Sequence, residues 1–216
     1  MRFLKSALAA AAFAAALPAS AAIVVLDFEG IGDLNPVGNF YNGGGGTNYG
    51  VEFSNDTLAV VDADDGGSGN FANEPSSNTI MFFLNANNAV LNYAAGFSTG
   101  FSFFYTSSTA ATVNVYDGLD GTGNLLGSLD LTAQHTQNCV GDPSGTFCNW
   151  TAVGLAFAGT AMSIDFGGTA NQTGFDNITF GSDVPGVPAI PEPSTYALMA
   201  LGLAGVGFAA RRRKAA

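Results

Sequence analysis

The sequence predicts an all-β protein: an antiparallel β-sandwich of jelly-roll type, flanked by an N-terminal signal peptide and a C-terminal single transmembrane helix. About ten short segments alternate apolar and polar residues, and a period of two is typical of half-buried strands. Phe101, Phe103 and Tyr105 show this alternation, as do Ile178 and Phe180. Gly, Asn, Asp and Ser separate the segments, as expected for tight turns, and many short strands joined by turns favour a sandwich.

The predicted strands fill a single body, residues 22–187, between a signal peptide at 1–21 and a terminal segment at 188–216. In chain order they are 23–30, 49–55, 57–64, 78–85, 100–107, 111–118, 124–132, 150–157, 162–168 and 175–182. A turn is predicted at 117–124, because its Asp-Gly and Gly-Asn steps supply positive φ angles. We find no fixed repeat period, which disfavours a β-solenoid.

The N-terminal segment has the layout of a secretory signal peptide. Arg2 and Lys5 precede an apolar run, and the small residues Ala19, Ser20 and Ala21 form a cleavage site. The run is shorter than the roughly 20 residues of a permanent transmembrane helix. The body is therefore expected outside the inner membrane.

The C-terminal segment also has three parts. The breaker-rich motif Pro191, Glu192 and Pro193 is followed by an apolar stretch at 196–210. At ~1.5 Å per residue this stretch reaches about 20 Å, so it spans the roughly 30 Å hydrocarbon core only with snorkelling and local thinning. A basic cluster then fixes the membrane orientation, because basic flanks stay cytoplasmic. Its members are Arg211, Arg212, Arg213 and Lys214.

This tail resembles the PEP-CTERM sorting signal of Gram-negative bacteria in its motif, helix and basic cluster. The resemblance implies an exosortase substrate: a membrane-embedded transpeptidase-like enzyme would cut near Pro191–Pro193, so that the inner membrane holds the protein only transiently. It also implies an association with exopolysaccharide and biofilm. The same tail is sometimes labelled an ice-binding protein C-terminal domain, which says nothing about the body. The alternative is a permanent C-terminal anchor.

The charge of the body is one-sided. All six Lys and Arg lie in the two terminal segments, and Glu192 alone of the 17 acidic residues lies outside the body, which leaves 16 acids and no Lys or Arg between 22 and 187. Nucleic acid and anionic membranes should be repelled, because affinity for either comes from basic side chains. Any buried carboxylate needs neutral donors, a proton or a metal ion.

Two cysteines, Cys139 and Cys148, flank a turn-forming Gly-Asp-Pro-Ser-Gly segment. Because the chain is expected to be exported, we predict a disulfide, which stabilises by roughly 2–3 kcal/mol in the chain-entropy model. Zinc or redox chemistry is disfavoured, since no C-x-x-C is present.

No catalytic constellation is evident, and we predict that the protein is not an enzyme. The lone histidine, His135, lies in a polar segment, and Ser68 lacks the G-x-S-x-G elbow of a nucleophilic serine. Paired carboxylates are too easily found among so many acids to indicate a glycosidase.

Calcium is the one predicted cofactor, at either of two places. Asp62, Asp64 and Asp65 resemble the start of an EF-hand loop. The pattern is incomplete, because its ligand positions five and twelve are Gly66 and Asn73 here. A solvated acidic turn is the alternative interpretation.

The second place joins the two ends of the body. Its arrangement loosely resembles the jelly-roll carbohydrate-binding modules in which the first and last strands share a structural calcium. Asp176 falls on the strand face of Ile178 and Phe180 and should point inward, where it would hold calcium with Glu29 or Asp27. Backbone N–H groups of a turn are the alternative partners.

Together these features predict an exported, non-catalytic β-sandwich protein sorted to the cell surface or matrix and associated with exopolysaccharide. The alternative is an adhesive module that binds carbohydrate or another ligand and carries a structural calcium. Sugar binding would favour exposed aromatic side chains on one face. Tyr41, Tyr49, Tyr93 and Trp150 are the candidates.

Overall fold

The computed structural model describes residues 23–137, 139–140 and 145–186. The predicted signal peptide, Pro-Glu-Pro motif, transmembrane helix and basic cluster lie outside the described residues. Within the described part of the chain, no helix is long and apolar enough to cross a membrane.

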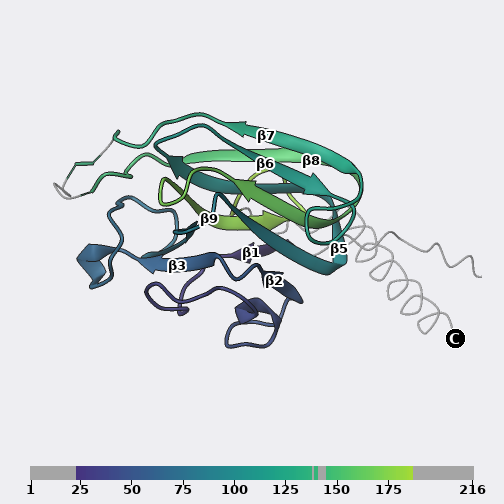
Figure 1. Cartoon of the computed structure of the whole chain (residues 1–216), viewed down its shortest axis with the longest axis horizontal. Coiled ribbons are helices and arrows are strands. Elements are labelled where there is room, and N and C mark those ends of the chain that lie inside the picture. Colours follow the sequence, from purple (N-terminus) through teal and green to yellow (C-terminus); the bar gives the residue numbers. More distant parts are fainter. Residues whose placement is uncertain (1–22, 138, 141–144, 187–216) are drawn as a thin grey trace, which may run out of the picture. The chain divides into compact units, whose positions relative to one another are not determined.

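The described chain forms nine antiparallel strands and two short 3₁₀ helices (Figure 1). They are β1 (Val24–Leu26), η1 (Phe40–Asn42), β2 (Val51–Phe53), β3 (Thr57–Val61), η2 (Ala63–Asp65), β4 (Thr79–Phe83), β5 (Asn88–Ser107), β6 (Ala111–Tyr116), β7 (Leu125–Leu131), β8 (Thr151–Gly167) and β9 (Thr173–Phe180). The strand order is β3-β4-β9-β5-β8-β6-β7, with β1 paired to β9 and β2 paired to β5.

The two longest strands, β5 and β8, belong to both layers of the sandwich. Residues 88–92 of β5 pair with 163–167 of β8, whereas 99–105 pair with 151–157, and the register shifts between the two stretches. Gly96 lies in this shift with a φ of 73°, a conformation that glycine adopts at low cost. The irregularity lets one continuous sheet fold back on itself.

One layer contains β3, β4, β9, β1 and the second half of β5 with the first half of β8. The other contains β2, the first half of β5, the second half of β8, β6 and β7. Aromatic side chains fill the space between the layers. The ring of Phe166 lies 5.8 Å from that of Phe101, 5.7 Å from Phe103 and 5.0 Å from Phe175. Each fully buried phenylalanine contributes roughly 1.5–3 kcal/mol of hydrophobic stabilisation.

The predicted all-β, antiparallel sandwich is confirmed, with two differences in its strands. The predicted strands 150–157 and 162–168 are both parts of β8, and β5 begins at Asn88 rather than near residue 100. Both differences arise at the bend, where bulges and small residues interrupt the alternation that marks a strand. The predicted turn at 117–124 is present, with Asp117 N–H donating to the Asn124 carbonyl at 3.1 Å.

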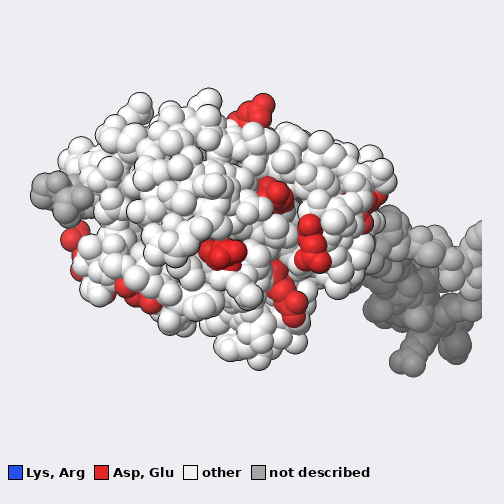
Figure 2. Space-filling model, in the orientation of Figure 1, with Lys and Arg blue, Asp and Glu red and all other residues white. Residues whose placement is uncertain are grey.

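The described surface carries carboxylates without basic side chains. Figure 2 shows them spread over one face rather than gathered in one patch. Ion pairs with Lys or Arg therefore do not contribute to the stability of this part of the chain.

Candidate functional site

The last strand carries a buried carboxylate at a bulge. On one side of β9, Phe175 pairs with Met81 of β4, and Ile178 pairs with Leu26 of β1, so Asp176 lies where one neighbour ends and the other begins. Asn177 has a φ of 50°, and the register with β5 shifts beside it. This bulge places both Phe175 and Ile178 in the main core, which interrupts the simple alternation from which an inward Asp176 was predicted.

Asp176 is nevertheless fully buried, as predicted, with a relative exposure of 0%. The N–H of Ser76 donates to its Oδ2 at 2.8 Å, and the N–H of Asn177 donates to its Oδ1 at 2.6 Å. The Ser76 hydroxyl lies 2.8 and 2.9 Å from the two carboxylate oxygens. Two of these contacts, from the N–H groups of Ser76 and Asn177, are of the kind that the alternative prediction named: backbone N–H groups as the partners of Asp176.

The hydroxyl of Ser76 is surrounded by acceptors. Besides the Asp176 oxygens, it lies 3.2 Å from the main-chain carbonyl of Asp27 and 3.5 Å from Oε1 of Glu29. A hydroxyl carries one proton and can satisfy one acceptor at a time. We call Asp27, Glu29, Ser76 and Asp176 the acidic centre; its oxygen acceptors outnumber the one proton of the Ser76 hydroxyl, and backbone N–H groups donate to Asp176 and Glu29 as well.

Two of its members are positioned by neighbouring hydrogen-bond donors. Glu29 Oε1 accepts from the N–H groups of Asn78 at 2.9 Å and Thr79 at 3.0 Å. The carboxylate of Asp27 instead accepts from Tyr41, whose hydroxyl lies 3.5 Å from Oδ1. The predicted set of Asp176, Glu29 and Asp27 therefore does come together, but Asp27 faces Ser76 through its main-chain oxygen.

Burial governs the electrostatics of this centre. It raises the pKa of the Asp176 carboxyl to about 7; the bonds from Ser76 and Asn177 lower it less, and the charge of Glu29 raises it further. Burial also raises the pKa of the Tyr41 hydroxyl well above its ordinary value, and the nearby charges of Asp27 and Asp176 add to this rise. A cation at the centre would favour the ionised carboxylate.

The second predicted calcium site is differently composed. One carboxylate oxygen from each of Asp62, Asp65 and Glu74 lies within 4.8 Å of the other two. Asp64 is not part of this group; its N–H donates to Oδ1 of Asp62 at 3.3 Å, so that Asp62 caps η2. Burial raises the pKa of Glu74, and the charges of Asp62 and Asp65 raise it further.

The predicted disulfide is present, and it joins Cys139 to Cys148 with a Cα–Cα distance of 5.0 Å. His135 lies beside it, because its carbonyl accepts from the Cys148 N–H at 2.8 Å. The His135 ring is half-buried and lies 5.4 Å from the ring of Phe147. It therefore serves as a packing partner in the described structure.

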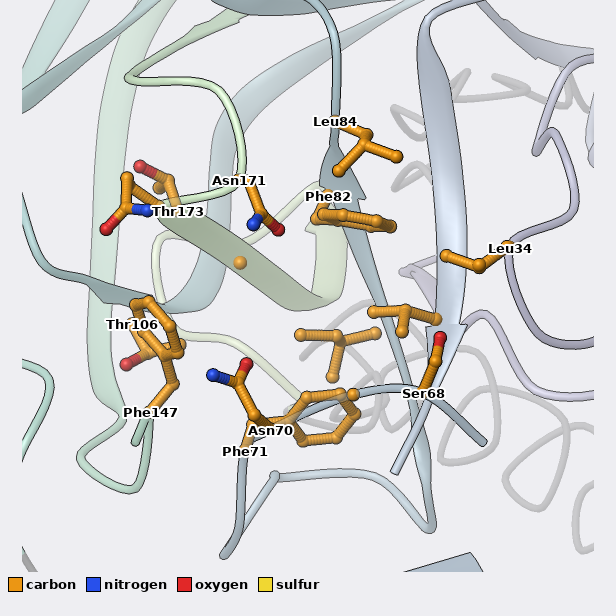
Figure 3. Close-up of a pocket in the computed structure, with 15 residues that line it drawn as sticks. Leu34, Ser68, Asn70, Phe71, Phe82, Leu84, Thr106, Phe147, Asn171 and Thr173 are labelled. Carbon is orange, nitrogen blue, oxygen red and sulfur yellow. The ribbon is translucent and has the colours of Figure 1, made fainter. Parts of the chain in front are cut away.

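The four predicted aromatic candidates do not form one exposed face. Tyr41 is buried, and Tyr49 and Tyr93 pack against the main core, whereas Trp150 packs in a separate cluster. A pocket lined by Phe71, Phe82 and Phe147 was not predicted from the sequence (Figure 3). Phe71 and Phe147 each follow a Gly-x dipeptide outside the alternating segments, but so does Phe40, so the sequence does not single them out.

Comparison with known proteins identifies the tail. Residues 189–214 carry a PEP-CTERM protein-sorting motif, which confirms the predicted exosortase-substrate signal. No curated protein matches the chain.

Several solved carbohydrate-binding modules show a weak structural similarity. The alignment with a family 6 carbohydrate-binding module covers 74% of this chain and 93% of that module, at 15% identity and a TM-score of 0.39. The alignment with a family 6 module of Cellvibrio mixtus lichenase 5A, solved with cellotriose, covers 59% of this chain and 87% of that module, at 13% identity and a TM-score of 0.35. The alignment with the CBM35 of Paenibacillus barcinonensis covers 61% of this chain and 92% of that protein, at 18% identity and a TM-score of 0.34. These TM-scores are too low to assign a fold or a ligand.

Proposed function

We propose that this protein is an exported, exosortase-sorted component of the cell surface or extracellular matrix, whose β-sandwich body associates with exopolysaccharide without catalysing a reaction. The PEP-CTERM motif at 189–214 carries the proposal, because such motifs mark exported proteins that are processed at the membrane. The signal-peptide layout of residues 1–21 agrees with it.

The chemistry of the body supports a non-catalytic role. In the described residues, His135 packs against Phe147 and has no serine or cysteine thiol as a bonded partner. Asp176 is fully buried and bonded to Ser76 and Asn177, which suits a structural carboxylate better than an acid or base that must reach a substrate.

The charge of the body restricts its polysaccharide partner. Sixteen acids without Lys or Arg repel polyanions, so the favoured polysaccharide is neutral, or is an acidic one bridged by divalent cations. The described surface shows no basic side chain that would offset this repulsion (Figure 2).

Calcium is the cofactor that best fits the acidic centre. Ca²⁺ is bound by carboxylate and carbonyl oxygens, and the centre offers Asp176, Glu29 and the main-chain oxygen of Asp27 around one hydroxyl. A bound ion would supply the positive charge that the body's own side chains lack. Asp27 and Glu29 also line an open cavity, although Ser76 and Asp176 do not belong to its lining. The group of Asp62, Asp65 and Glu74 is the alternative calcium site.

Co-sedimentation tests the association with polysaccharide. The full chain, kept soluble in a polyoxyethylene detergent, is mixed with purified exopolysaccharide of a PEP-CTERM-bearing bacterium, once in chelator and once in millimolar calcium. We expect the protein in the pellet in calcium, with serum albumin remaining in the supernatant as the acidic control. Equal recovery of both proteins in the supernatant contradicts the proposal.

A further inference from the structure

We propose that the pocket beneath Phe147 is a binding site for one neutral sugar ring of a polysaccharide, held by aromatic stacking and by the hydroxyl of Thr106. This inference rests on the proposed function, whose ligand class and contact residues it specifies. The pocket has a volume of about 210 Å³ and lies over β4 and β9, on the face of the sheet opposite the main core (Figure 3).

The apolar floor of the pocket is a consequence of strand alternation in β4. Met81 and Phe83 point into the main core, so Ile80 and Phe82 must point to the other face. There they form a second cluster with Val60 and Phe71. No strand of the described chain covers this cluster; the irregular segments that carry Phe71 and Phe147 do, and they leave the pocket between them.

These two segments are fastened to each other, so the pocket is formed without a ligand. The carbonyl of Asn70 accepts from the N–H groups of Thr146 at 2.7 Å and Phe147 at 3.2 Å, and the Phe147 carbonyl accepts from Ala72 at 3.1 Å. The disulfide at Cys148 ties down the residue after Phe147. A site that is already ordered loses little conformational entropy on binding.

One polar group in the pocket lacks a partner. Thr106 is 1% exposed, and its Oγ1 is the one buried side-chain oxygen or nitrogen in the described residues that makes no hydrogen bond. Buried hydroxyls are nearly always bonded, so an exception indicates a missing ligand or an ordered water molecule. A ligand hydroxyl would satisfy Thr106.

The residue opposite Thr106 leaves open space beside the Thr106 side chain. Gly174 pairs with Thr106 in the sheet, and a Cβ added there would lie 2.8 Å from Cδ1 of Ile80 and 3.5 Å from Cγ2 of Thr106. Any larger residue at 174 would therefore fill the floor of the pocket. The glycine leaves the space in which a ligand could contact Thr106.

The remaining lining combines apolar side chains, among them Leu34 and Leu84, with uncharged polar groups. Asn70, Asn171 and Gln172 contribute amides, and among the described residues no Asp, Glu, Lys, Arg or His lines the pocket. The Gln172 amide oxygen accepts from the Ser108 hydroxyl, which fixes its orientation. The side chains of Asn70 and Asn171 make no hydrogen bond to other described residues and can donate to or accept from a ligand.

These properties together favour a neutral sugar ring. Its C–H face suits the rings of Phe82 and Phe147, and its hydroxyls both donate and accept, as amides and Thr106 do. A charged ligand would find no counter-charge, and an apolar peptide side chain would leave Thr106 unbonded. The volume is below the roughly 300–1,000 Å³ of pockets for larger ligands, which limits the occupant to about one ring.

Isothermal titration calorimetry tests the site. The probes are three neutral tetrasaccharides, cellotetraose, laminaritetraose and maltotetraose, added to the full chain in a polyoxyethylene detergent, because sugar-headed detergents would compete. We expect at least one tetrasaccharide to bind. Phe147→Ala should weaken it about tenfold through the lost stacking area, and Thr106→Val about threefold through the lost hydrogen bond.

Leu125→Ala is the matched control, because Leu125 is an exposed apolar residue on β7, outside the pocket lining, and its loss should leave affinity unchanged. Thr106→Val removes a hydroxyl without a partner, so its melting temperature should not fall, which separates lost binding from lost folding. Unchanged or tighter tetrasaccharide binding by Thr106→Val would show that the Thr106 hydroxyl does not bond to the sugar and would overturn the inference. Wild-type titrations without heat for all three sugars would also overturn it.

The failure of this site is distinguishable from failure of the proposed function. If the wild type co-sediments with exopolysaccharide and both pocket variants do so equally, the pocket inference is wrong and the proposed function stands. If the tail is not processed but a tetrasaccharide binds and the variants weaken it, the pocket inference stands and the sorting proposal fails.

Discussion

The stability of the body should fall as the pH rises from 5 to 8 in the presence of a chelator, because of Asp176. Burial raises the pKa of this carboxyl from an ordinary value of 3.8 to about 7 in the folded state. Between these values the folded protein holds a proton that the unfolded chain has released. The stabilisation is therefore fully present below about pH 4 and is lost as the pH rises through 7.

The magnitude follows from the two pKa values. At ~1.36 kcal/mol per pKa unit, Asp176 alone costs about 2.5–3 kcal/mol of unfolding free energy between pH 5 and pH 8. For a domain of this size ~1 kcal/mol corresponds to roughly 2–4 °C, so the melting temperature should fall by about 5–10 °C. Repulsion among the other carboxylates acts in the same direction, so a variant is needed to isolate the contribution of Asp176.

Differential scanning calorimetry of the wild type, Asp176→Asn and Asp56→Asn provides the comparison. Asp176→Asn cannot ionise and should lose most of the pH dependence between 5 and 8. Asp56→Asn removes an exposed carboxylate in the turn between β2 and β3 and should keep it. If Asp176→Asn and the wild type lose the same stability over this range, the assignment of the buried charge is wrong.

Four further results are expected. At pH 8, calcium at a hundredfold excess over its dissociation constant should raise the unfolding free energy of the wild type by about 2.7 kcal/mol beyond sodium chloride of matched ionic strength. Asp176→Asn should abolish this gain, whereas loss of the gain in Asp62→Ala instead would move the site to Asp62, Asp65 and Glu74. Cys148→Ser should cost roughly 2–3 kcal/mol in urea unfolding, and labelling of both thiols in unreduced protein would contradict the disulfide. Gly174→Leu should destabilise by about 1–3 kcal/mol, because its side chain collides with Ile80, and should also abolish sugar binding; a fully stable variant that still binds sugar would refute the described floor of the pocket.

Local patterns predicted those parts of the fold that depend on neighbours in sequence. Alternation identified the strands, and the turn residues at 117–124 identified a hairpin connection. The start of β5 was missed because Gly96 and the surrounding small residues break the period at the bend. The buried position of Asp176 was predicted, but the bulge at Asn177 was not, since Asp176, Ile178 and Phe180 alternate as they would in a strand without a bulge.

The sites depend on contacts between distant residues, and this is why they were predicted only in part. Ser76 bonds to Asp176 across 100 residues, and no periodicity connects a serine in an irregular segment to a strand that far away. The prediction placed Asp27 and Glu29 beside Asp176 because the first and last strands were expected to be neighbours, which they are. The pocket joins Phe71 to Phe147 through a long-range bridge, and its key hydroxyl, Thr106, reads in the sequence as an ordinary strand residue.

Sorting at the C-terminus is the central claim, and the intact mass of the protein recovered from the cell surface tests it most directly. The chain should be expressed in an exosortase-positive bacterium and in a matched strain that lacks the enzyme. We expect a mature mass without residues 1–21 and without most of 196–216 in the first strain, and a mass that retains the C-terminal segment in the second. A surface protein that keeps Arg211, Arg212, Arg213 and Lys214 in both strains would contradict the claim and identify the tail as a permanent anchor.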